Sequence, residues 1–494
     1  MTENSALNLG NWLHIDGSAG GSPLLLPARH LVTHGVVVGM TGSGKTGLVT
    51  VLAEEALRAQ IPTIIIDVKG DLPNLLLTFP SCAPSLVGPW LGEEKGAASD
   101  SLVLERCAAR ERALAEWSIG EPELSALVSG STVRVLTPGS TAGEPLHVLS
   151  ALERRSARWD TDPEGARAAL ATAISLVLKL LGRDSDPAKS REHVLLSVLA
   201  ERRLKAGENA DIARLVHDVL EPPVTDIGVL PLHSFMKPAE RRTLSAALNT
   251  LLASPSFASW RQGVSLSVDD WVKPQRGRTP AVVVSVAHLD DEERALVLGV
   301  VLEEILSWVR GLPGSSQLRA LLIFDEIYGY LPPHPSNPPT KRALVSLMKQ
   351  ARAFGVGVVL ATQNPMDLDY RALSNAGLWC LGRLQTDADR DRVVDGLNGG
   401  SKQQAAQLHA TLKRLAPRWF MVQNAHARDV GPILMQPRHT MSVLRGPLTR
   451  AELIRAQALR NHLNGLGSSP TPPPPSSPPK LQLVAPYPAK ARAM

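Results

Sequence analysis

One short string constrains this chain more than any other feature: residues 39–46 read Gly-Met-Thr-Gly-Ser-Gly-Lys-Thr. This is the G-x-x-x-x-G-K-T pattern of a phosphate-binding loop, whose glycines let successive backbone N–H groups point at phosphate oxygens. Lys45 can reach the β- and γ-phosphates, and the Thr46 hydroxyl can ligate Mg²⁺. The residues predicted to hold the triphosphate are Gly39, Met40, Thr41, Gly42, Ser43, Gly44, Lys45, Thr46 and Gly47.

The sequence around this loop has the required context. The β-branched run 36–38 precedes it, and apolar residues recur at helical spacing from Leu48 to about residue 59. A strand, a glycine loop and a helix in this order place a helix N-terminus against the phosphate. The alternative is a chance glycine turn, and the flanking elements count against it.

A second apolar run ends in two acids, since Asp325 and Glu326 follow residues 321–324. Many strands end in a solvated acid, but downstream of a phosphate loop this pair predicts chemistry. Asp325 would hold Mg²⁺, and Glu326 would orient and polarise the attacking water as a general base. Phosphoryl transfer depends on positioning and charge neutralisation, which such groups supply.

Three further residues are candidates for the same reaction. Gln363 follows the apolar run 356–361, so it falls at the sheet edge where ligands of open α/β sheets bind. Its amide can hydrogen-bond the γ-phosphate or the water, although a loop glutamine can also cap backbone groups. Arg352 and Arg383 flank this region, and hydrolytic motors use an arginine, often from a neighbouring subunit. A surface salt bridge is the alternative for each arginine.

Another strand-end turn stays open between two interpretations. The apolar run 61–66 ends in Asp67, and Lys69 and Asp71 follow in the next four residues. Asp71 can cap the helix that begins near residue 72, and Lys69 can be a solvated charge. Both residues also lie at the carboxyl end of a strand, where they can contribute to the site.

Strands alternating with helices predict an α/β fold: a RecA-like P-loop core on a central, mostly parallel sheet. Between the strands lies a range with helical spacing, predicted as a mostly helical insertion, and the chain ends in a proline-rich tail predicted to be disordered. The predicted units are short N-terminal strands and turns (1–35), the core (36–90 and 275–440), the insertion (91–274), a C-terminal helical segment (441–467) and the tail (468–494).

Composition narrows the class of protein. Hydrophobic residues make up 44% and charged residues 20%, which is typical of a globular protein. Three widely spaced cysteines give no metal signature and suit a reducing compartment, and aromatics at 4% count against a base-stacking platform. The sequence shows neither a signal peptide nor an apolar stretch long enough for a bilayer, so we expect a cytoplasmic protein without membrane insertion.

Taken in order, the motifs resemble those of the HerA/FtsK superfamily of hexameric P-loop ATPases, and the HerA-like bacterial proteins in particular. The strings that carry the resemblance are 38–46, Asp67-x-Lys69-Gly70-Asp71, 323–326 and 361–365. Residues 349–356 are similar to the segment that carries the superfamily's trans-acting arginine, which favours Arg352 over Arg383. The resemblance implies ATP, Mg²⁺, a homohexamer, double-stranded DNA as substrate, and a nuclease or other effector as partner.

The leading hypothesis is therefore an ATPase motor that translocates or remodels double-stranded DNA. It would grip backbone phosphates with basic residues, and the candidates are Lys341, Arg342, Lys349 and Arg371. Two alternatives stay open: a secretion or conjugation ATPase that moves protein or nucleoprotein, and an ATP-dependent switch that recruits an effector. Glu326 counts against the switch, because a pure binder needs no water-activating acid. A small-molecule kinase is disfavoured, since no acceptor-binding signature is visible.

Overall fold

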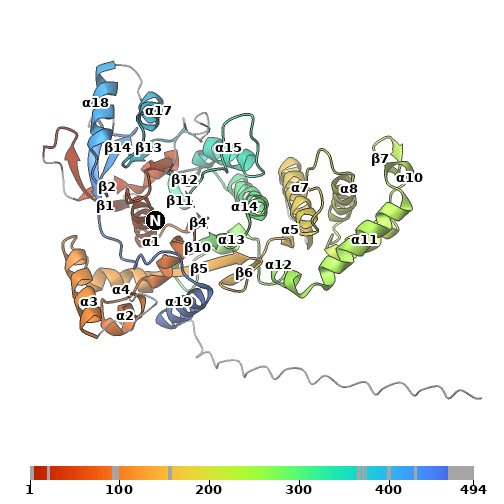
Figure 1. Ribbon diagram of the computed structural model, residues 1–494, viewed down its shortest axis with the longest axis horizontal. Helices are drawn as coiled ribbons and strands as arrows, with labels where there is room; N and C mark the ends of the chain where they lie inside the picture. The colour runs from red at the N-terminus through yellow and green to blue at the C-terminus, as the bar shows by residue number, and fades with distance from the viewer. Residues whose placement is uncertain are drawn as a thin grey trace, which may run out of the picture.

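The computed structural model describes residues 5–18, 20, 23–91, 100–153, 158–363, 369, 373, 375–397, 402–427 and 431–465. Arg371 and the predicted tail lie outside this part of the chain. The described residues form one large sheet with helices on both faces, and a helical lobe projects from one side of it (Figure 1).

Within the described residues the main sheet has thirteen strands. In spatial order they are β2 (Leu24–Pro27), β1 (Ala6–His14), β15 (Ile433–Pro437), β14 (Phe420–Asn424), β13 (Leu378–Leu381), β3 (Gly35–Val38), β12 (Phe354–Thr362), β11 (Ser315–Asp325), β4 (Thr63–Asp67), β10 (Thr279–Ser285), β5 (Ser131–Pro138), β6 (Glu144–His147) and β9 (Val264–Ser265). A separate hairpin pairs β7 (Asp226–Ile227) with β8 (Leu230–Pro231).

The sheet is parallel over most of its width. Neighbouring strands from β13 through β3, β12, β11, β4, β10, β5 and β6 to β9 all run parallel. At β13 the sheet continues into an antiparallel extension of β14, β15, β1 and β2. The parallel part confirms the predicted α/β P-loop fold class. The extension strands β14 and β15 were not predicted, because five-residue strands give little periodicity.

The central strands read as unbroken apolar runs because both of their faces are covered. In β4, Ile64 and Ile66 join the hydrophobic core on one side of the sheet, whereas Ile65 joins the core on the other side. β10 repeats this alternation with Val282 and Val283. Side chains alternate along a strand, so a strand between two helical layers needs apolar residues at every position.

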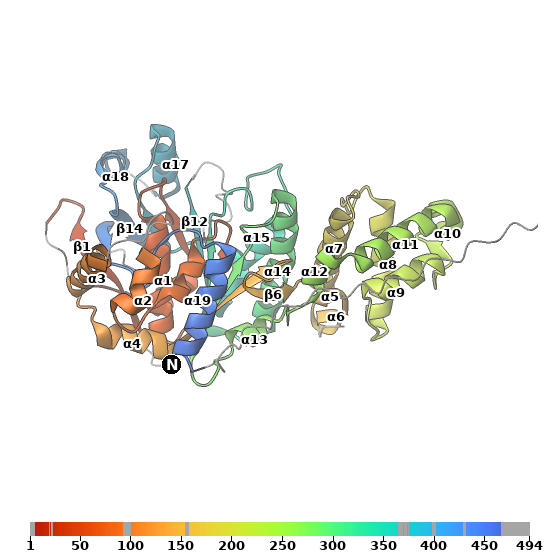
Figure 2. The same cartoon turned by 60° about the horizontal axis from the view of Figure 1, so that its bottom comes forward.

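The two layers use different helices. α1, α4 and α19 contribute to one core, and Figure 2 shows α19 beside α1. α14, α15 and α18 contribute to the other core. The helices are α1 (Lys45–Arg58), α2 (Pro84–Leu91), α3 (Asp100–Ala115), α4 (Glu121–Gly130), α5 (Ser150–Glu153), α6 (Arg158–Thr161), α7 (Pro163–Leu180), α8 (Arg191–Lys205), α9 (Ile212–Leu220), α10 (Leu232–Phe235), α11 (Pro238–Ala253), α12 (Ala258–Arg261), α13 (Val268–Val272), α14 (Asp291–Gly311), α15 (Lys341–Gln350), α17 (Asp387–Leu397), α18 (Lys402–Arg414) and α19 (Arg450–Leu463), with 3₁₀ turns η1 (Ala28–Thr33), η2 (Leu72–Leu77), η3 (Pro255–Phe257) and η4 (Ala351–Ala353).

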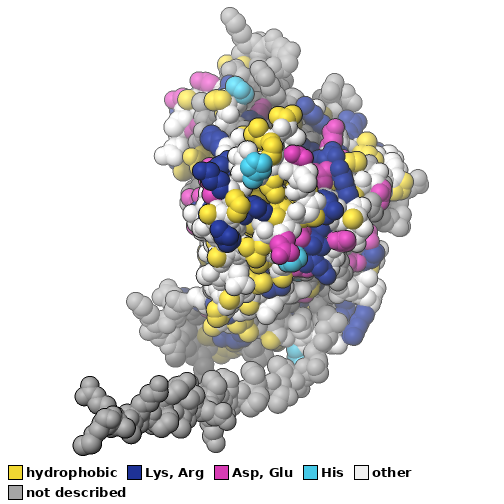
Figure 3. All heavy atoms as spheres, turned by 90° about the vertical axis from the view of Figure 1, so that its right-hand side faces the viewer, with side chains coloured by type: hydrophobic (Ala, Val, Ile, Leu, Met, Phe, Trp, Pro, Cys, Tyr) yellow, Lys and Arg dark blue, Asp and Glu magenta, His cyan; other side chains and the backbone are white. Residues whose placement is uncertain are grey.

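The lobe contains α7, α8, α9 and α11, which follow the helical spacing seen in the sequence (Figure 1). The range predicted as a helical insertion also supplies β5, β6 and β9 to the main sheet. At the far end of the lobe Leu220, Val229 and Leu230 are exposed. Figure 3 shows hydrophobic side chains gathered between Lys and Arg on this face.

A strap of residues 438–449 runs from β15 to α19 and is fastened to α1. Arg438 is fully buried, and its guanidinium donates to Glu54 Oε2 at 2.8 Å and to Glu55 Oε1 at 2.9 Å. Ser442 also donates to Glu54, through its backbone N–H at 2.7 Å and its hydroxyl at 2.8 Å. The paired charges and the extra donors satisfy these buried carboxylates. Across the described residues, no helix combines the length and the apolar character needed to cross a bilayer.

Candidate nucleotide site

The phosphate loop joins β3 to α1 and depends on glycine at specific positions. Gly42 and Gly44 have φ angles of 80° and 94°, in the left-handed region that favours glycine. A Cβ on Gly39 would come 2.4 Å from Ser43 Oγ, whereas one on Gly47 would meet nothing within 4 Å. α1 begins at Lys45, so its first-turn N–H groups open toward the loop and favour an anion.

The structure brings the predicted acids to this loop, although 280 residues separate them in the sequence. Lys45 Nζ lies 3.1 Å from Asp325 Oδ1 and 3.0 Å from Glu326 Oε2. Strand order explains the meeting: β3 and β11 are separated only by β12, and both end at the same sheet edge. Lys45 and Asp325 are buried, so their ion pair is shielded from solvent.

Three donors converge on one oxygen of Glu326. Besides Lys45, the Lys69 ammonium lies 2.7 Å from Oε2 and the Gln363 amide donates to it at 2.9 Å. Burial alone would raise the pKa of Glu326, but the two lysines outweigh it and hold this pKa below its usual value. Glu326 also has a φ of 62°, a strained conformation for a non-glycine residue that is typical of functional sites. In this state its carboxylate is ionised and engaged.

Gln363 links the acid to the phosphate loop. Its amide nitrogen donates to Glu326, and its carbonyl Oε1 accepts from the Thr41 hydroxyl at 2.7 Å. Gln363 directly follows β12, the strand between β3 and β11. The predicted position at the carboxyl edge therefore agrees with the structure, and the side chain contacts both parts of the site.

The turn after β4 places Lys69, whose role the sequence left open. Asp67 accepts from the Gly70 N–H at 3.0 Å and from the Ser285 hydroxyl at 2.8 Å. Burial raises the pKa of Asp67 to about 7, and the Asp325 charge adds to this, while the donors oppose it. Asp67 thus supports the turn from within the fold. The 3₁₀ turn η2 does begin at residue 72, but the Asp71 side chain makes no capping hydrogen bond to it in the described structure.

The residues predicted to hold Mg²⁺ are suited to that ion. Thr46 is in the first turn of α1, and Asp325 ends β11 beside Lys45. A hydroxyl and a carboxylate are hard oxygen ligands, and Mg²⁺ in such sites takes further ligands from water and substrate phosphates. Among the described residues, no three His, Cys, Asp or Glu side chains are gathered as an all-protein metal site. An ion bound here would therefore depend on the phosphates for the rest of its coordination.

The two candidate arginines lie at opposite edges of the sheet. The Arg383 carbonyl accepts from the Met40 N–H at 2.9 Å, so Arg383 belongs to the phosphate loop of its own chain. Arg352 lies in η4, before β12 begins, whereas the loop follows the carboxyl end of β3. β12 has nine residues, which span roughly 30 Å. Arg352 therefore cannot reach the phosphate loop of its own chain.

Sequence reasoning missed a third arginine, Arg418. Its N–H donates to the Ser43 carbonyl at 2.9 Å, its φ is 64°, and a Cβ on Gly44 would come 3.2 Å from its Cα. The exposed Arg418 side chain thus starts directly over the loop. No motif distinguishes Arg418 from other arginines, because only the return of β14 to β13 brings it there.

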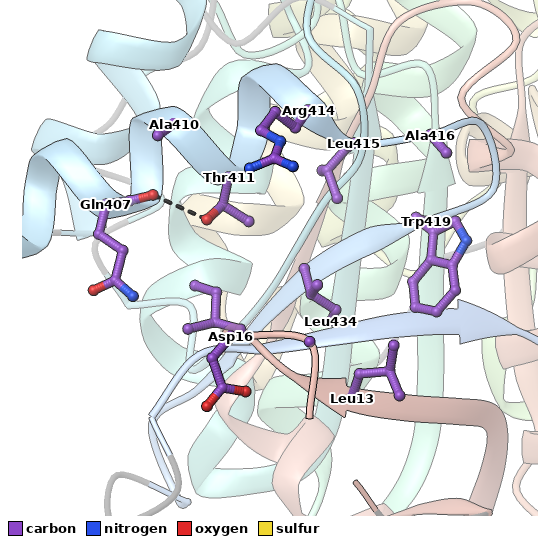
Figure 4. Close-up of a pocket in the computed structure, with 12 residues that line it drawn as sticks. Leu13, Asp16, Gln407, Ala410, Thr411, Arg414, Leu415, Ala416, Trp419 and Leu434 are labelled. Carbon is purple, nitrogen blue, oxygen red and sulfur yellow. Dashed lines mark hydrogen bonds between the residues drawn. The ribbon is translucent and has the colours of Figure 1, made fainter. Parts of the chain in front are cut away.

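A separate cavity lies next to the segment that carries Arg418. It has a volume of about 540 Å³ and lies between α18 and the antiparallel extension, where Leu13, Trp419 and Leu434 line it (Figure 4). Trp419 and Phe420 contribute to opposite cores of the sheet. α1 packs with the core that contains Phe420, so this cavity is not part of the phosphate loop.

Two of the four basic residues proposed for DNA have partners within the chain. Lys341 lies 3.5 Å from Asp369, and Arg342 lies 3.9 Å from Glu303. Lys349 is exposed near Arg352 at the amino edge of the sheet, and Arg371 lies outside the described residues. The structure therefore does not gather these four residues into one patch.

Comparison with known proteins agrees with the motif-based resemblance. Residues 7–98 match the sequence model of the family described as the central domain of the helicase HerA. This segment is of the HerA type. It contains the phosphate loop and Lys69, while Asp325, Glu326 and Gln363 lie outside it and reach it through the fold. The chain thus carries a P-loop nucleoside-triphosphatase core. A search of curated proteins finds no match.

Solved structures with a similar chain arrangement come from several systems. VirB4 of Thermoanaerobacter pseudethanolicus is 15% identical, with 88% of this chain and 97% of that chain covered and a TM-score of 0.49. The bacterial conjugative coupling protein TrwBdeltaN70 is 14% identical, with 91% and 92% covered and a TM-score of 0.46. The genome packaging NTPase B204 from Sulfolobus turreted icosahedral virus 2 is 16% identical, with 35% and 72% covered and a TM-score of 0.24.

Proposed function

We propose that this chain is an ATP-hydrolysing motor of the HerA/FtsK type that acts on double-stranded DNA as a homohexameric ring. The observation that carries the proposal is the position of Lys45, 3.1 Å from Asp325 and 3.0 Å from Glu326. A phosphate-binding lysine and a water-activating acid are thereby in one place, which binding alone would not require. The HerA-type segment at residues 7–98 supports DNA as the substrate.

Each residue then has a defined task. A triphosphate in the loop draws Lys45 from the carboxylates to its phosphate oxygens, which frees Glu326 from one of its three donors. Glu326 accepts a proton from the attacking water, and Gln363 orients that water or the γ-phosphate. Mg²⁺ held by Thr46 and Asp325 would neutralise phosphate charge. Arg352 of a neighbouring copy stabilises the charge of the transition state.

The proposal is tested by ATPase assays with and without duplex DNA, on the wild type and on Lys45→Ala, with light scattering on the same samples. Lys189→Ala, which removes an exposed lysine in the lobe, is the matched control. We expect hydrolysis that duplex DNA stimulates, loss of hydrolysis in Lys45→Ala only, and the mass of a ring. A monomer whose ATPase rate ignores DNA of every kind would contradict the motor.

A further inference from the structure

A second charged site lies at the edge of the sheet opposite the phosphate loop. A cavity of about 660 Å³ opens there, and we call it the amino-edge pocket. Its walls come from η1, from the start of β11, and from the end of α15 with η4, which all precede parallel strands. Arg29, Lys349 and Arg352 line it, together with His30 and His426.

The charge in this pocket is of one sign. Arg29, Lys349 and Arg352 are exposed, and no carboxylate is among the described residues that line the cavity. Within the described part of the chain, none of the three forms an ion pair. Burial and the nearby Arg352 charge lower the pKa of His34, which lies behind the pocket, to about 4. A cavity that concentrates one sign of charge attracts an anion of opposite charge.

One wall of the pocket is a stacked pair of imidazoles. The rings of His30 and His426 lie 4.5 Å apart at 17°. Thr33 and Asn424 hold them from the side, at 3.0 Å from His426 Nε2 and 3.0 Å from His30 Nδ1. Burial and the neighbouring charges lower the pKa of His30 to about 4, so this ring is neutral near pH 7. The attraction for anions therefore comes from the two arginines and the lysine.

We propose that the amino-edge pocket receives the terminal phosphates of a nucleotide bound in the phosphate loop of a second copy of this chain. Arg29 and Lys349 then act on that triphosphate together with Arg352. This inference rests on the proposed function and extends it, because it makes each catalytic site a joint product of two copies.

The open side of the phosphate loop favours this source of phosphate. Thr41 and Gly42 are exposed, and the charged groups that contact Glu326 within its own chain are lysines. The loop and the pocket lie at opposite edges of one sheet, so a head-to-tail contact brings them together, and repeated contacts of this kind close into a ring. Three cations also match the charge of a triphosphate, and arginine suits phosphate oxygens geometrically.

The test uses complementation between two inactive variants. Arg29→Ala/Lys349→Ala removes two cations from the pocket, and Lys45→Ala disables the loop. Arg167→Ala/Lys205→Ala, in the lobe, removes the same charge as a control. We measure ATP turnover of each protein and of 1:1 mixtures, and binding of a fluorescent ATP analogue.

We expect the pocket variant to bind the analogue within about twofold of wild type while its turnover falls on the order of a hundredfold. Mixing it with Lys45→Ala should restore turnover to about a quarter of wild type, since random assembly gives that share of intact interfaces. A mixture that stays at the level of its two parents overturns the inference.

A further arm separates a shared site from a site for free anions. Calorimetry with tripolyphosphate and Lys45→Ala protein reports binding at the pocket alone. Tight binding to monomers that Arg29→Ala/Lys349→Ala abolishes would assign the pocket to a free anion and overturn the shared site. If the wild type hydrolyses ATP but mixtures are not restored, only this inference fails. A wild type without hydrolysis removes the proposed function as well.

Discussion

The two edges of the sheet hold charge in opposite ways. At the carboxyl edge two lysines meet two acids within 3.1 Å, largely shielded from solvent, and Gln363 completes the network. At the amino edge two arginines and a lysine share a cavity without a carboxylate among the described lining residues. The first edge is neutralised within one chain, whereas the second needs an anion from outside.

This difference teaches where a single chain is sufficient. Its own residues can bind a triphosphate and activate a water, because loop, acids and Gln363 meet within one sheet edge. The cations that would complete the reaction lie roughly 30 Å away, the length of β12. Binding and turnover should therefore respond differently to changes at the two edges.

The largest effect on turnover is expected from Glu326→Gln. The amide keeps the size of the side chain but cannot accept a proton, so multiple-turnover hydrolysis should fall by about 10²–10⁴. Binding of a fluorescent ATP analogue should persist. Turnover within twofold of wild type would assign the base elsewhere and reopen the interpretation as a nucleotide switch.

Substitution of the two arginines separates the edges directly. Arg352→Ala should lower kcat by about 10²–10³ while analogue affinity stays within twofold, because its target is another copy's nucleotide. Arg383→Ala should change affinity instead, since Arg383 contacts the loop of its own chain. Mixing Arg352→Ala with Lys45→Ala protein is the check: recovery supports action in trans, and the reverse pattern between the arginines would contradict the edge assignment.

Lys69→Met should lower kcat about tenfold and change its pH dependence. The pKa of Glu326 is held below its usual value, so the base stays ionised, and wild-type activity should persist, down to acidic pH. Without Lys69 the effect of burial gains weight, the pKa rises, and the acid limb of the kcat–pH profile should move to higher pH. Lys69→Arg should restore the limb. An unchanged limb in Lys69→Met would show that Lys69 does not act through Glu326.

The smallest effect is expected from Thr41→Val, which removes the 2.7 Å hydrogen bond to Gln363. One neutral hydrogen bond is worth about 1 kcal/mol, so kcat should fall by about fivefold. Steady-state kinetics measures this, and the change should depend on Gln363: in a Gln363→Ala background, Thr41→Val should have no further effect. Additive losses in the double variant would show that the two residues act separately.

The sequence predicted the parts of the site that follow from local pattern. The phosphate loop has a fixed spacing, and acids after buried runs must lie at the carboxyl edge of a parallel sheet. The positions of Asp325, Glu326 and Gln363 were therefore predictable although they are distant in the chain. The amphipathic helices of the lobe were equally visible, because an apolar stripe repeats along each of them.

What could not be predicted depends on three-dimensional arrangement. Lys69 contacts Glu326 only because Asp67 and Gly70 shape its turn, with Gly70 at a φ of 89°. Arg418 reaches the loop through an antiparallel return that short strands do not announce. The strand order alone places Arg352 and Arg383 at opposite edges, so the sequence had to leave both as candidates.

The way in which the lobe leaves the sheet also matters. β6 leads into it and β9 leads out of it, and these strands pair directly, Leu146 with Val264 and His147 with Ser265. The more than one hundred residues between them thus depart from and return to adjacent points of the core. Such a module can be exchanged for another, or excised behind a short linker, without altering the register of the nucleotide-binding strands. Relatives could acquire new partners by swapping this cassette while the engine stays the same.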